Sequence, residues 1–230
     1  MSTFEFLPST RRGFVGRTAA ALALTLTPAL PRWAEAEAPT RRPDPGTPGD
    51  EWMKHLTGKH KQLFDMKTHA NGVGLLHVRN YLDTWRDAYH LTDQDVTPVL
   101  TFYGAGLPMG FDDSAWAKYP FGDAMKVTDP KTNAPARRNI FYKPEAGDGI
   151  AFGMLDSSID QLVARGTVCI MCNNALAFWT MQLEKGGMGK AADIRADLVQ
   201  HLLPGVSLVP AMVIAIGQAQ ERGCAYMALG

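Results

Sequence analysis

The segment that most constrains the fold is an apolar run that leads directly into a helical pattern. Val168–Met171 are consecutive apolar residues, which is typical of a strand buried within a sheet. Asn173 follows as a good helix N-cap, and the apolar positions after it fit the period of a helix. We therefore expect a strand that ends at Cys172 and a helix that begins at Asn173. In an open α/β sheet, this edge is where ligands and reactive groups collect.

The chain before and after this segment alternates between apolar strands and amphipathic helices. Connections of helical length favour parallel pairing of successive strands. The predicted fold is therefore α/β, a three-layer α/β/α sandwich with a mainly parallel sheet of about five strands. The predicted strands are 62–66, 95–103, 168–172, 206–210 and 224–228, and the main predicted helices are 73–89, 157–165, 173–184, 192–203 and 211–222.

The N-terminal part reads as a signal for export. Arg11 and Arg12 form a twin-arginine pattern, followed by an apolar stretch and by small residues around Ala36. We predict a twin-arginine (Tat) signal peptide over 1–36, cleavage after it, and a periplasmic location. An uncleaved membrane anchor is the alternative, but the apolar stretch is shorter than the ~20 residues that a span needs, and prolines interrupt it.

Three further regions complete the predicted organisation. Residues 37–60 include a stretch rich in Pro, Thr, Arg and Gly and are expected to be a flexible arm. Residues 61–230 are expected to form one α/β domain. Within it, the polar segment 127–146 contains several prolines and is expected to be a long surface loop or insertion.

Charge and cysteine content narrow the possible functions. The formal net charge is zero and no basic block occurs, so a nucleic-acid surface is not expected. The chain has 3 cysteines, an odd number, so at least one thiol is free or pairs between chains in an oxidising compartment.

The spacing of the cysteines argues against a redox pair. Cys169 and Cys172 form a C-x-x-C pattern, but residues three apart on a strand point to opposite faces. Cys224 opens the last predicted strand and can meet Cys172 only if the two strands are neighbours with aligned ends. A structural zinc site is not expected, because no second pair of cysteines is present.

Five residues are candidates for a functional site. Cys172, at the start of a helix, is the candidate nucleophile, because free N–H groups and the helix dipole favour a thiolate. Asn173 and Asn174 are expected to cap the helix and orient a ligand. His69 is the expected polar neighbour or base, and His69 and His77 are candidate ligands for haem or a metal ion. The alternatives are a buried structural thiol and solvated histidines.

The second half of the chain resembles a known family. Cys172 at a strand end, the segment Leu203–Val213 (LPGVSLVPAMV) and the strand Gly223–Tyr226 (GCAY) are similar to the DsrE/DsrF-like family of small α/β proteins. The resemblance covers residues 166–228. It implies a parallel sheet, homo-oligomers that are often trimers or hexamers, and in several members a cysteine that carries sulfane sulfur as a persulfide. That cysteine corresponds to Cys172.

These observations lead to three hypotheses. The first is an exported DsrE-like protein that accepts and passes on sulfane sulfur through Cys172, from small sulfur species or a sulfur-donor protein. The second is a haem- or metal-binding redox or carrier protein of the periplasm that uses His69, His77 or a methionine. The third is a non-catalytic oligomeric binding module in which every cysteine belongs to the core.

Overall fold

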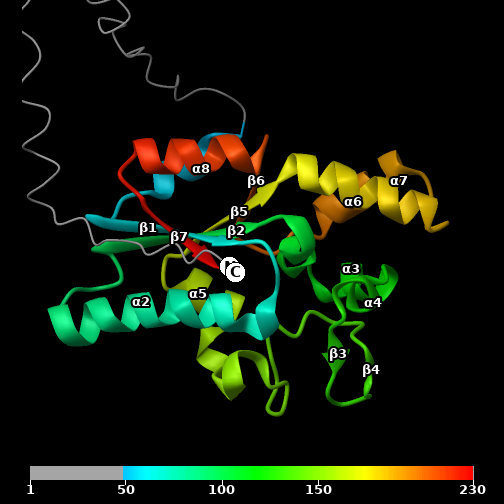
Figure 1. Ribbon diagram of the computed structural model, residues 1–230, viewed down its shortest axis with the longest axis horizontal. Coiled ribbons are helices and arrows are strands. Elements are labelled where there is room, and N and C mark those ends of the chain that lie inside the picture. The colour runs from blue at the N-terminus through cyan, green and yellow to red at the C-terminus, as the bar shows by residue number, and fades with distance from the viewer. Residues whose placement is uncertain (1–48, 230) are drawn as a thin grey trace, which may run out of the picture. The chain divides into compact units, whose positions relative to one another are not determined.

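The sheet is built on two strands that are buried along their whole length, β2 (Val96–Phe102) and β5 (Val168–Cys172). The structure, a computed structural model, describes residues 49–229, so the predicted signal peptide and the first half of the predicted arm, 37–48, lie outside the described residues. The five strands are all parallel, in the order β6-β5-β2-β1-β7, and helices flank them (Figure 1). The predicted α/β fold with a parallel sheet is confirmed.

The elements follow the predicted alternation closely. The remaining strands are β1 (His60–Met66), β6 (Val206–Val209) and β7 (Ala225–Leu229), and a separate hairpin contains β3 (Thr128–Asp129) and β4 (Ala134–Pro135). The α-helices are α2 (Val73–Tyr89), α3 (Asp113–Lys118), α4 (Phe121–Met125), α5 (Ile159–Ala164), α6 (Asn173–Lys185), α7 (Ala191–Gln200) and α8 (Met212–Glu221). The 3-10 helices are η2 (Glu51–His55), η3 (Ala70–Gly72), η4 (Gly104–Gly110), η5 (Ile150–Gly153) and η6 (Leu155–Ser157).

The two faces of the sheet carry different layers. Helices α2 and α5 cover one face, and α8 with η2 covers the other (Figure 1). Alternate residues of each strand belong to opposite clusters: Leu63 packs on the α8 face and Phe64 on the α2 face. This period of two decides which side chains near the strand ends can meet.

Pro98 lies inside the central strand β2, although prolines are normally confined to edge strands or to the first residue of a strand. Its partner on β1 is Gln62, and pairing of β2 with β5 begins only at Val99. The missing N–H of Pro98 therefore falls where β5 has not yet begun, so the ladder with β5 loses no donor there.

Residues 50–55, expected to belong to the arm, pack against the sheet. Trp52 in η2 is only 1% exposed and Met53 is buried beside it on the α8 face. Burial of a tryptophan side chain is worth about 1.5–3 kcal/mol, enough to hold a short helix in place. The ordered domain thus begins before the first strand.

The segment 127–146, predicted to be a surface loop or insertion, is exposed over much of its length but is anchored to the domain by buried residues. Val127, Ala136, Ile140 and Phe141 are buried in the same cluster as α2. The guanidinium of Arg138 donates two hydrogen bonds to the carboxylate of Asp129 and two to that of Asp148, with nitrogen–oxygen distances of 2.5 to 3.0 Å. The segment is folded onto the domain by a small apolar core and an internal salt-bridge cluster.

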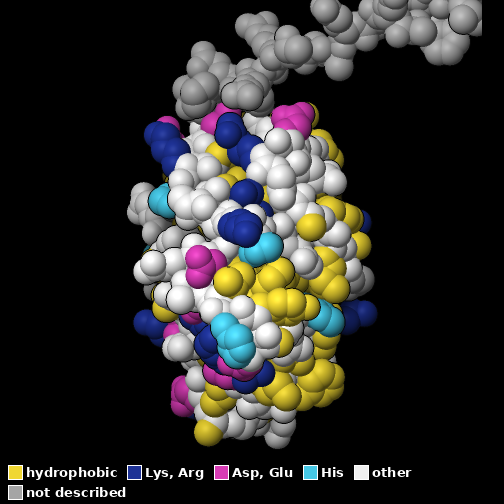
Figure 2. Space-filling view, turned by 90° about the vertical axis from the view of Figure 1, so that its left-hand side faces the viewer, with side chains coloured by type: hydrophobic (Ala, Val, Ile, Leu, Met, Phe, Trp, Pro, Cys, Tyr) yellow, Lys and Arg dark blue, Asp and Glu magenta, His cyan; other side chains and the backbone are white. Residues whose placement is uncertain are grey.

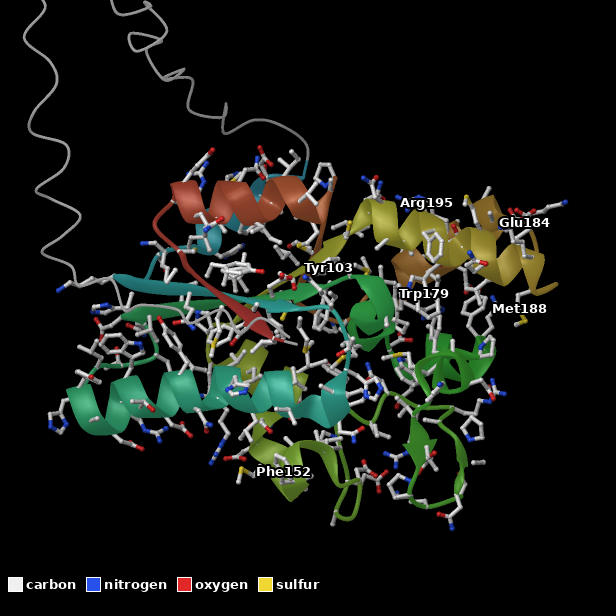
Figure 3. All side chains as sticks on the ribbon, in the orientation of Figure 1. Tyr103, Phe152, Trp179, Glu184, Met188 and Arg195 are labelled. Atoms are coloured by element: carbon white, nitrogen blue, oxygen red, sulfur yellow. The ribbon has the colours of Figure 1, made fainter. Side chains whose placement is uncertain are left out.

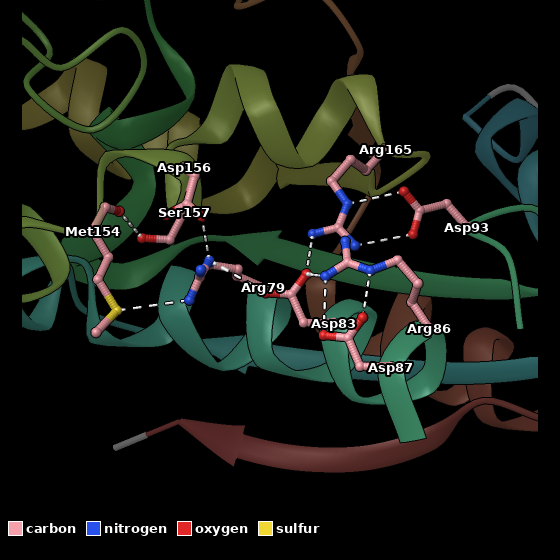
Figure 4. Close-up of polar contacts among 9 residues, drawn as sticks. All are labelled: Arg79, Asp83, Arg86, Asp87, Asp93, Met154, Asp156, Ser157 and Arg165. Atoms are coloured by element: carbon pink, nitrogen blue, oxygen red, sulfur yellow. Dashed lines mark hydrogen bonds and ion pairs between the residues drawn. The ribbon is translucent and has the colours of Figure 1, made fainter. Parts of the chain in front are cut away.

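Asp156 immediately precedes the helix predicted over 157–165, but it is not the N-cap of α5. The cap position is Ser158, and Asp156 pairs with Arg79 of α2 at 2.7 Å. Arg165, at the end of α5, contacts Asp83 and Asp93 at 2.8 and 2.9 Å (Figure 4). These ion pairs join α2, α5 and the loop before β2.

The amino ends of the strands carry an aromatic stack on the surface. The rings of His60 and Trp85 stack with centroids 4.1 Å apart, and Tyr89 lies 4.7 Å from Trp85. Figure 2 views the molecule from this side and shows apolar side chains gathered beside histidines. Among the described residues, no helix is both long and apolar enough to cross a bilayer.

Candidate functional site

Cys172 ends β5 at the carboxyl edge of the sheet, as predicted. Its side chain lies on the α8 face, within a cluster that includes Ile170, Val209 and Met212. The residue is 6% exposed, whereas Asn174, two positions later, is exposed. Apolar side chains of the sheet and of α8 therefore cover the Cys172 sulfur, whereas the first turn of α6 is exposed from Asn174.

Two backbone amides point at this sulfur. The N–H of Ala175 donates to Cys172 Sγ at 3.4 Å, and the N–H of Met212 donates to it at 3.3 Å. Ala175 lies in the first turn of α6, and Met212 is the first residue of α8. Two helix N-termini thus converge on one thiol, and both their free N–H groups and their dipoles favour a negative charge there.

The N-cap of α6 is Cys172 itself, and the prediction of Asn173 was wrong. Cys172 has extended backbone angles and its side chain accepts from Ala175, whereas Asn173 is already the first helical residue. A cysteine sulfur two bonds from Cα reaches the third amide of the helix in the way a serine hydroxyl does. Asn173 is half-buried and Asn174 exposed in this first turn, and their role in orienting a ligand stays a prediction.

A polar group that sequence reasoning missed lies at the same edge of the sheet as Cys172, on β1, two strands away from β5. Asp65 of β1 is 2% exposed, and its carboxylate accepts a hydrogen bond from the Tyr226 hydroxyl at 2.6 Å and one from Thr101 at 3.4 Å. Lys67 Nζ lies 3.9 Å from the same carboxylate. Asp65 thus places a buried, hydrogen-bonded carboxyl group near the carboxyl edge of the sheet.

Tyr103 follows β2, the strand that lies between β1, which carries Asp65, and β5, which ends at Cys172. It follows β2 directly (Figure 3), and it is the next position after Phe102, which pairs with Met171 immediately before Cys172. Burial, a hydrogen bond with Asp65 and the nearby Cys172 raise the pKa of the Tyr103 phenol well above its ordinary value. Burial is the largest of these causes, so the phenol stays protonated.

The positions of Asp65, Tyr103 and Tyr226 along their strands indicate that they share one face, but only once the order of the strands is known. Asp65 lies within β1, two residues beyond Leu63, and Tyr103 comes just after β2, four residues beyond Val99, so the strand period puts both on the α8 face. Tyr226 is the register partner of Leu63, and its long side chain reaches forward to Asp65. Finding the group requires the strand order, which places β7 beside β1.

The other two cysteines are separate from Cys172, and all three are free thiols. Cys169 faces the α2 side, opposite to Cys172, as the strand period predicts, and burial raises the pKa of its thiol to about 12. Cys224 precedes β7, three strand positions from β5, and burial raises the pKa of its thiol despite the nearby Lys61.

His69 has both ring nitrogens engaged outside the Cys172 site. Its Nδ1 accepts from the N–H of Asn71 at 3.2 Å, and its Nε2 lies 3.0 Å from the carbonyl oxygen of Met125. Burial lowers the pKa of His69, although the bond to Met125 partly opposes this, so the neutral ring is favoured. Its ring also contacts Phe141, on the α2 side of the sheet. These contacts do not join it to Cys172, whose hydrogen-bonding donors are both amides.

His77 is exposed on α2 and lines a cavity of about 140 Å³ between β1, β7 and the start of α2. The same cavity is lined by Met66 and Met227 but not by His69. Within residues 49–229, no group of three or more His, Cys, Asp or Glu side chains is arranged to hold a metal ion. A shared haem or metal site at the two histidines therefore finds no support in their positions.

Comparison with known proteins gives no relative for this chain. No protein-family model, no curated protein and no solved structure matches it significantly.

Proposed function

We propose that this protein carries sulfane sulfur as a persulfide on Cys172. The observation that supports the proposal most strongly is the pair of amide donors from α6 and α8 at the Cys172 sulfur. Hydrogen bonds to a charged acceptor are stronger than those to a neutral one, so this arrangement favours the thiolate over the thiol. A thiolate is the nucleophile that sulfur transfer requires.

The reaction is a thiol–polysulfide exchange with no external oxidant. The Cys172 thiolate attacks a sulfane sulfur of a polysulfide, and a new S–S bond forms at Sγ. The S–S bond inside the donor breaks, and the shortened polysulfide leaves with the electron pair. The persulfide is then attacked by an acceptor nucleophile, which takes the outer sulfur and returns the Cys172 thiolate.

The resemblance to the DsrE/DsrF-like family supports the same proposal. The segment Leu203–Val213 supplies β6 and the beginning of α8, and Gly223–Tyr226 leads into β7. From this resemblance we also propose assembly into a homo-oligomer, and from the twin-arginine pattern of Arg11 and Arg12 we propose export by the Tat pathway to the periplasm. Size-exclusion chromatography with light scattering tests the assembly, and a monomer at micromolar concentration would contradict it.

Cyanolysis tests the sulfur carrier directly. Purified reduced protein is treated with inorganic polysulfide, desalted and then treated with cyanide, which removes the outer sulfur as thiocyanate and leaves the thiolate. We expect about one thiocyanate per chain from wild type and from Cys224→Ser, and none from Cys172→Ser. Equal release from Cys172→Ser and wild type, with Cys172→Ser folded as judged by circular dichroism, would exclude Cys172 as the carrier.

A further inference from the structure

A cavity at the carboxyl edge of the sheet gathers three side chains that can bind a soft metal ion. It lies between the ends of β1 and β7 and the beginning of α2, and its volume is about 140 Å³. Met66, His77 and Met227 line it, one from each of these elements. Ligands of open α/β proteins bind at this edge of the sheet. The cavity is separate from Cys172, which is not among its lining residues.

The sulfur of Met66 is held in place by the backbone of α2. Met66 is only 1% exposed, and a Cβ added to Gly74 would stand 2.7 Å from Met66 Sδ. The glycine therefore allows the first turn of α2 to lie directly against the thioether. His77 follows Gly74 by three residues, so both positions lie on the same side of the helix. The imidazole thus projects from the side of α2 that covers Met66.

Met227 brings a second sulfur from the neighbouring strand. Its register partner is Phe64, and Met66, two residues further along β1, lies on the same α2 face of the sheet. Gln62 Nε2 donates a hydrogen bond to Met227 Sδ at 3.4 Å, which leaves the second lone pair of the thioether available to a metal ion. Met227 is half-buried and His77 is exposed, so both side chains have room to turn toward the cavity.

We propose that Met66, His77 and Met227 form a binding site for the soft, singly charged ion Cu(I). Thioether sulfur selects Cu(I), and imidazole nitrogen also binds copper well, whereas Mg²⁺, Ca²⁺ and Mn²⁺ prefer carboxylate and carbonyl oxygen. This inference goes beyond the proposed sulfur carrier and uses none of its residues. Its outcome is therefore independent of whether Cys172 carries sulfur.

The charges around the cavity favour a monovalent ion over a divalent one. Among the described residues, no Asp, Glu, Lys or Arg lines the cavity. The first residues of α2 do line it, and a helix N-terminus carries a partial positive charge that opposes a divalent cation more strongly than a monovalent one. No lining carboxylate offsets this charge. Neutral sulfur ligands in such a place suit Cu(I) better than Zn²⁺, which is bound by thiolate, imidazole and carboxylate groups.

Competition for Cu(I) against bicinchoninate tests the site. The assay uses the full-length protein with Cys172→Ser, under anaerobic and reducing conditions, because a cysteine thiolate also binds Cu(I). We expect this protein to withdraw about one equivalent of Cu(I) from the coloured complex. Met66→Leu and Met227→Leu nearly keep the side-chain volume but lose the sulfur, and each should weaken binding by about tenfold or more, as should His77→Gln.

Met188→Leu is the matched control, because Met188 is an exposed methionine outside the cavity. It should bind Cu(I) as tightly as the protein with Cys172→Ser alone. Circular dichroism checks that each variant is folded. Equal affinities in Met66→Leu, Met227→Leu and Met188→Leu would overturn the inference, and so would a protein that withdraws no Cu(I) from bicinchoninate.

Methyl spectra of the protein locate the ion without relying on affinity. The chain has 11 methionines, which can be labelled with carbon-13 at the methyl group and assigned through the leucine variants. We expect Cu(I) to shift the methyl signals of Met66 and Met227 and to leave that of Met188 in place. Shifts confined to other methionines would contradict the site. Zn²⁺ at the same concentration should shift neither signal, and an equal response to Zn²⁺ would overturn the selectivity for a soft ion.

Discussion

The amide of Met212 donates a hydrogen bond to the sulfur of Cys172 across forty residues of sequence, at 3.3 Å. This contact joins the first residue of α8 to the last residue of β5. Together with the Ala175 amide, it makes the thiol an acceptor for two helices at once. The chemistry proposed for the protein depends on this junction.

Met212→Pro tests the contribution of this one amide. Met212 is the first residue of α8, where proline is tolerated, and Ala211 before it has the extended angles that a proline requires of its predecessor. At about pH 7 we expect alkylation of Cys172 to be roughly tenfold slower in Met212→Pro than in Met212→Ala, because the reacting sulfur loses one hydrogen-bond donor. Met212→Ala is the matched control, because it loses the same buried side chain but keeps the N–H.

The measurement is the rate of iodoacetamide alkylation at Cys172 at one fixed pH, with the modified peptide identified by mass. Equal rates in Met212→Pro and Met212→Ala would mean that the Met212 amide does not influence the reactivity of the thiol.

Selective alkylation distinguishes the three cysteines in the native protein. Burial raises the pKa of Cys169 to about 12 and also raises that of Cys224, whereas the sulfur of Cys172 accepts hydrogen bonds from two backbone amides. At about pH 8 we expect iodoacetamide to modify Cys172 at least ten times faster than the other two. Peptide mass mapping over time gives the three rates. Faster labelling of Cys169 than of Cys172 would contradict the placement of Cys169 on the buried α2 face of β5.

The salt-bridge cluster of segment 127–149 makes a prediction about stability. The side chain of Asp148 is 0% exposed, and Arg138 is its ion-pair partner and that of Asp129. Arg138→Met leaves two buried carboxylates without a counter-charge and should lower the free energy of unfolding by about 3–5 kcal/mol at neutral pH. Arg137→Met, at an exposed neighbour, should change it by less than about 0.5 kcal/mol.

The effect of Arg138→Met should depend on pH in a defined direction. Arg138 holds the pKa values of Asp129 and Asp148 below their ordinary range in the folded protein. Their stabilisation is therefore complete above the unfolded pKa of about 4 and is lost as pH falls through the folded values. Urea unfolding should show the gap between wild type and variant shrinking between pH 7 and about pH 3. A gap that widens on acidification would contradict the assignment.

Replacing a helical glycine by alanine should have opposite effects on stability at Gly122 and at Gly217. A Cβ at Gly122 of α4 would clash with the backbone of Ala136, whereas a Cβ at Gly217 of α8 would meet no atom within 4 Å. We expect Gly122→Ala to cost about 3 kcal/mol and Gly217→Ala to stabilise by about 0.5–1 kcal/mol. Thermal unfolding of the two variants checks both signs, and a neutral Gly122→Ala would mean that the 127–146 segment does not pack as described.

The sequence predicted those parts of the fold whose information is local. The buried runs of β2 and β5 and the apolar face of α2, with Leu75, Val78 and Leu82, each carry a clear period. Helix capping was less accurate, because the choice between Cys172 and Asn173 depends on one pair of backbone angles. The anchoring of segment 127–146 was not predicted, because its buried residues are scattered among exposed polar ones and Arg138 finds its partners Asp129 and Asp148 only in the folded segment.

Of the candidate site, the sequence predicted only the position of the Cys172 sulfur. The position of Cys172 follows from one strand and one helix, but its donor Met212 lies on another element. The Asp65–Tyr226 contact likewise requires β7 to lie beside β1, an order that no local pattern encodes. Sites assembled across strands therefore need the topology before they can be recognised.

The most direct test of the account is a peptide mass spectrum of the native protein after exposure to inorganic polysulfide and a thiol-blocking reagent. We predict that the peptide containing Val168–Cys172 gains about 32 Da, one sulfur atom, that fragmentation places it on Cys172, and that a reductant removes it. An unmodified Cys172 in folded, reduced protein, or added sulfur found on Cys169 or Cys224 instead, would contradict the account.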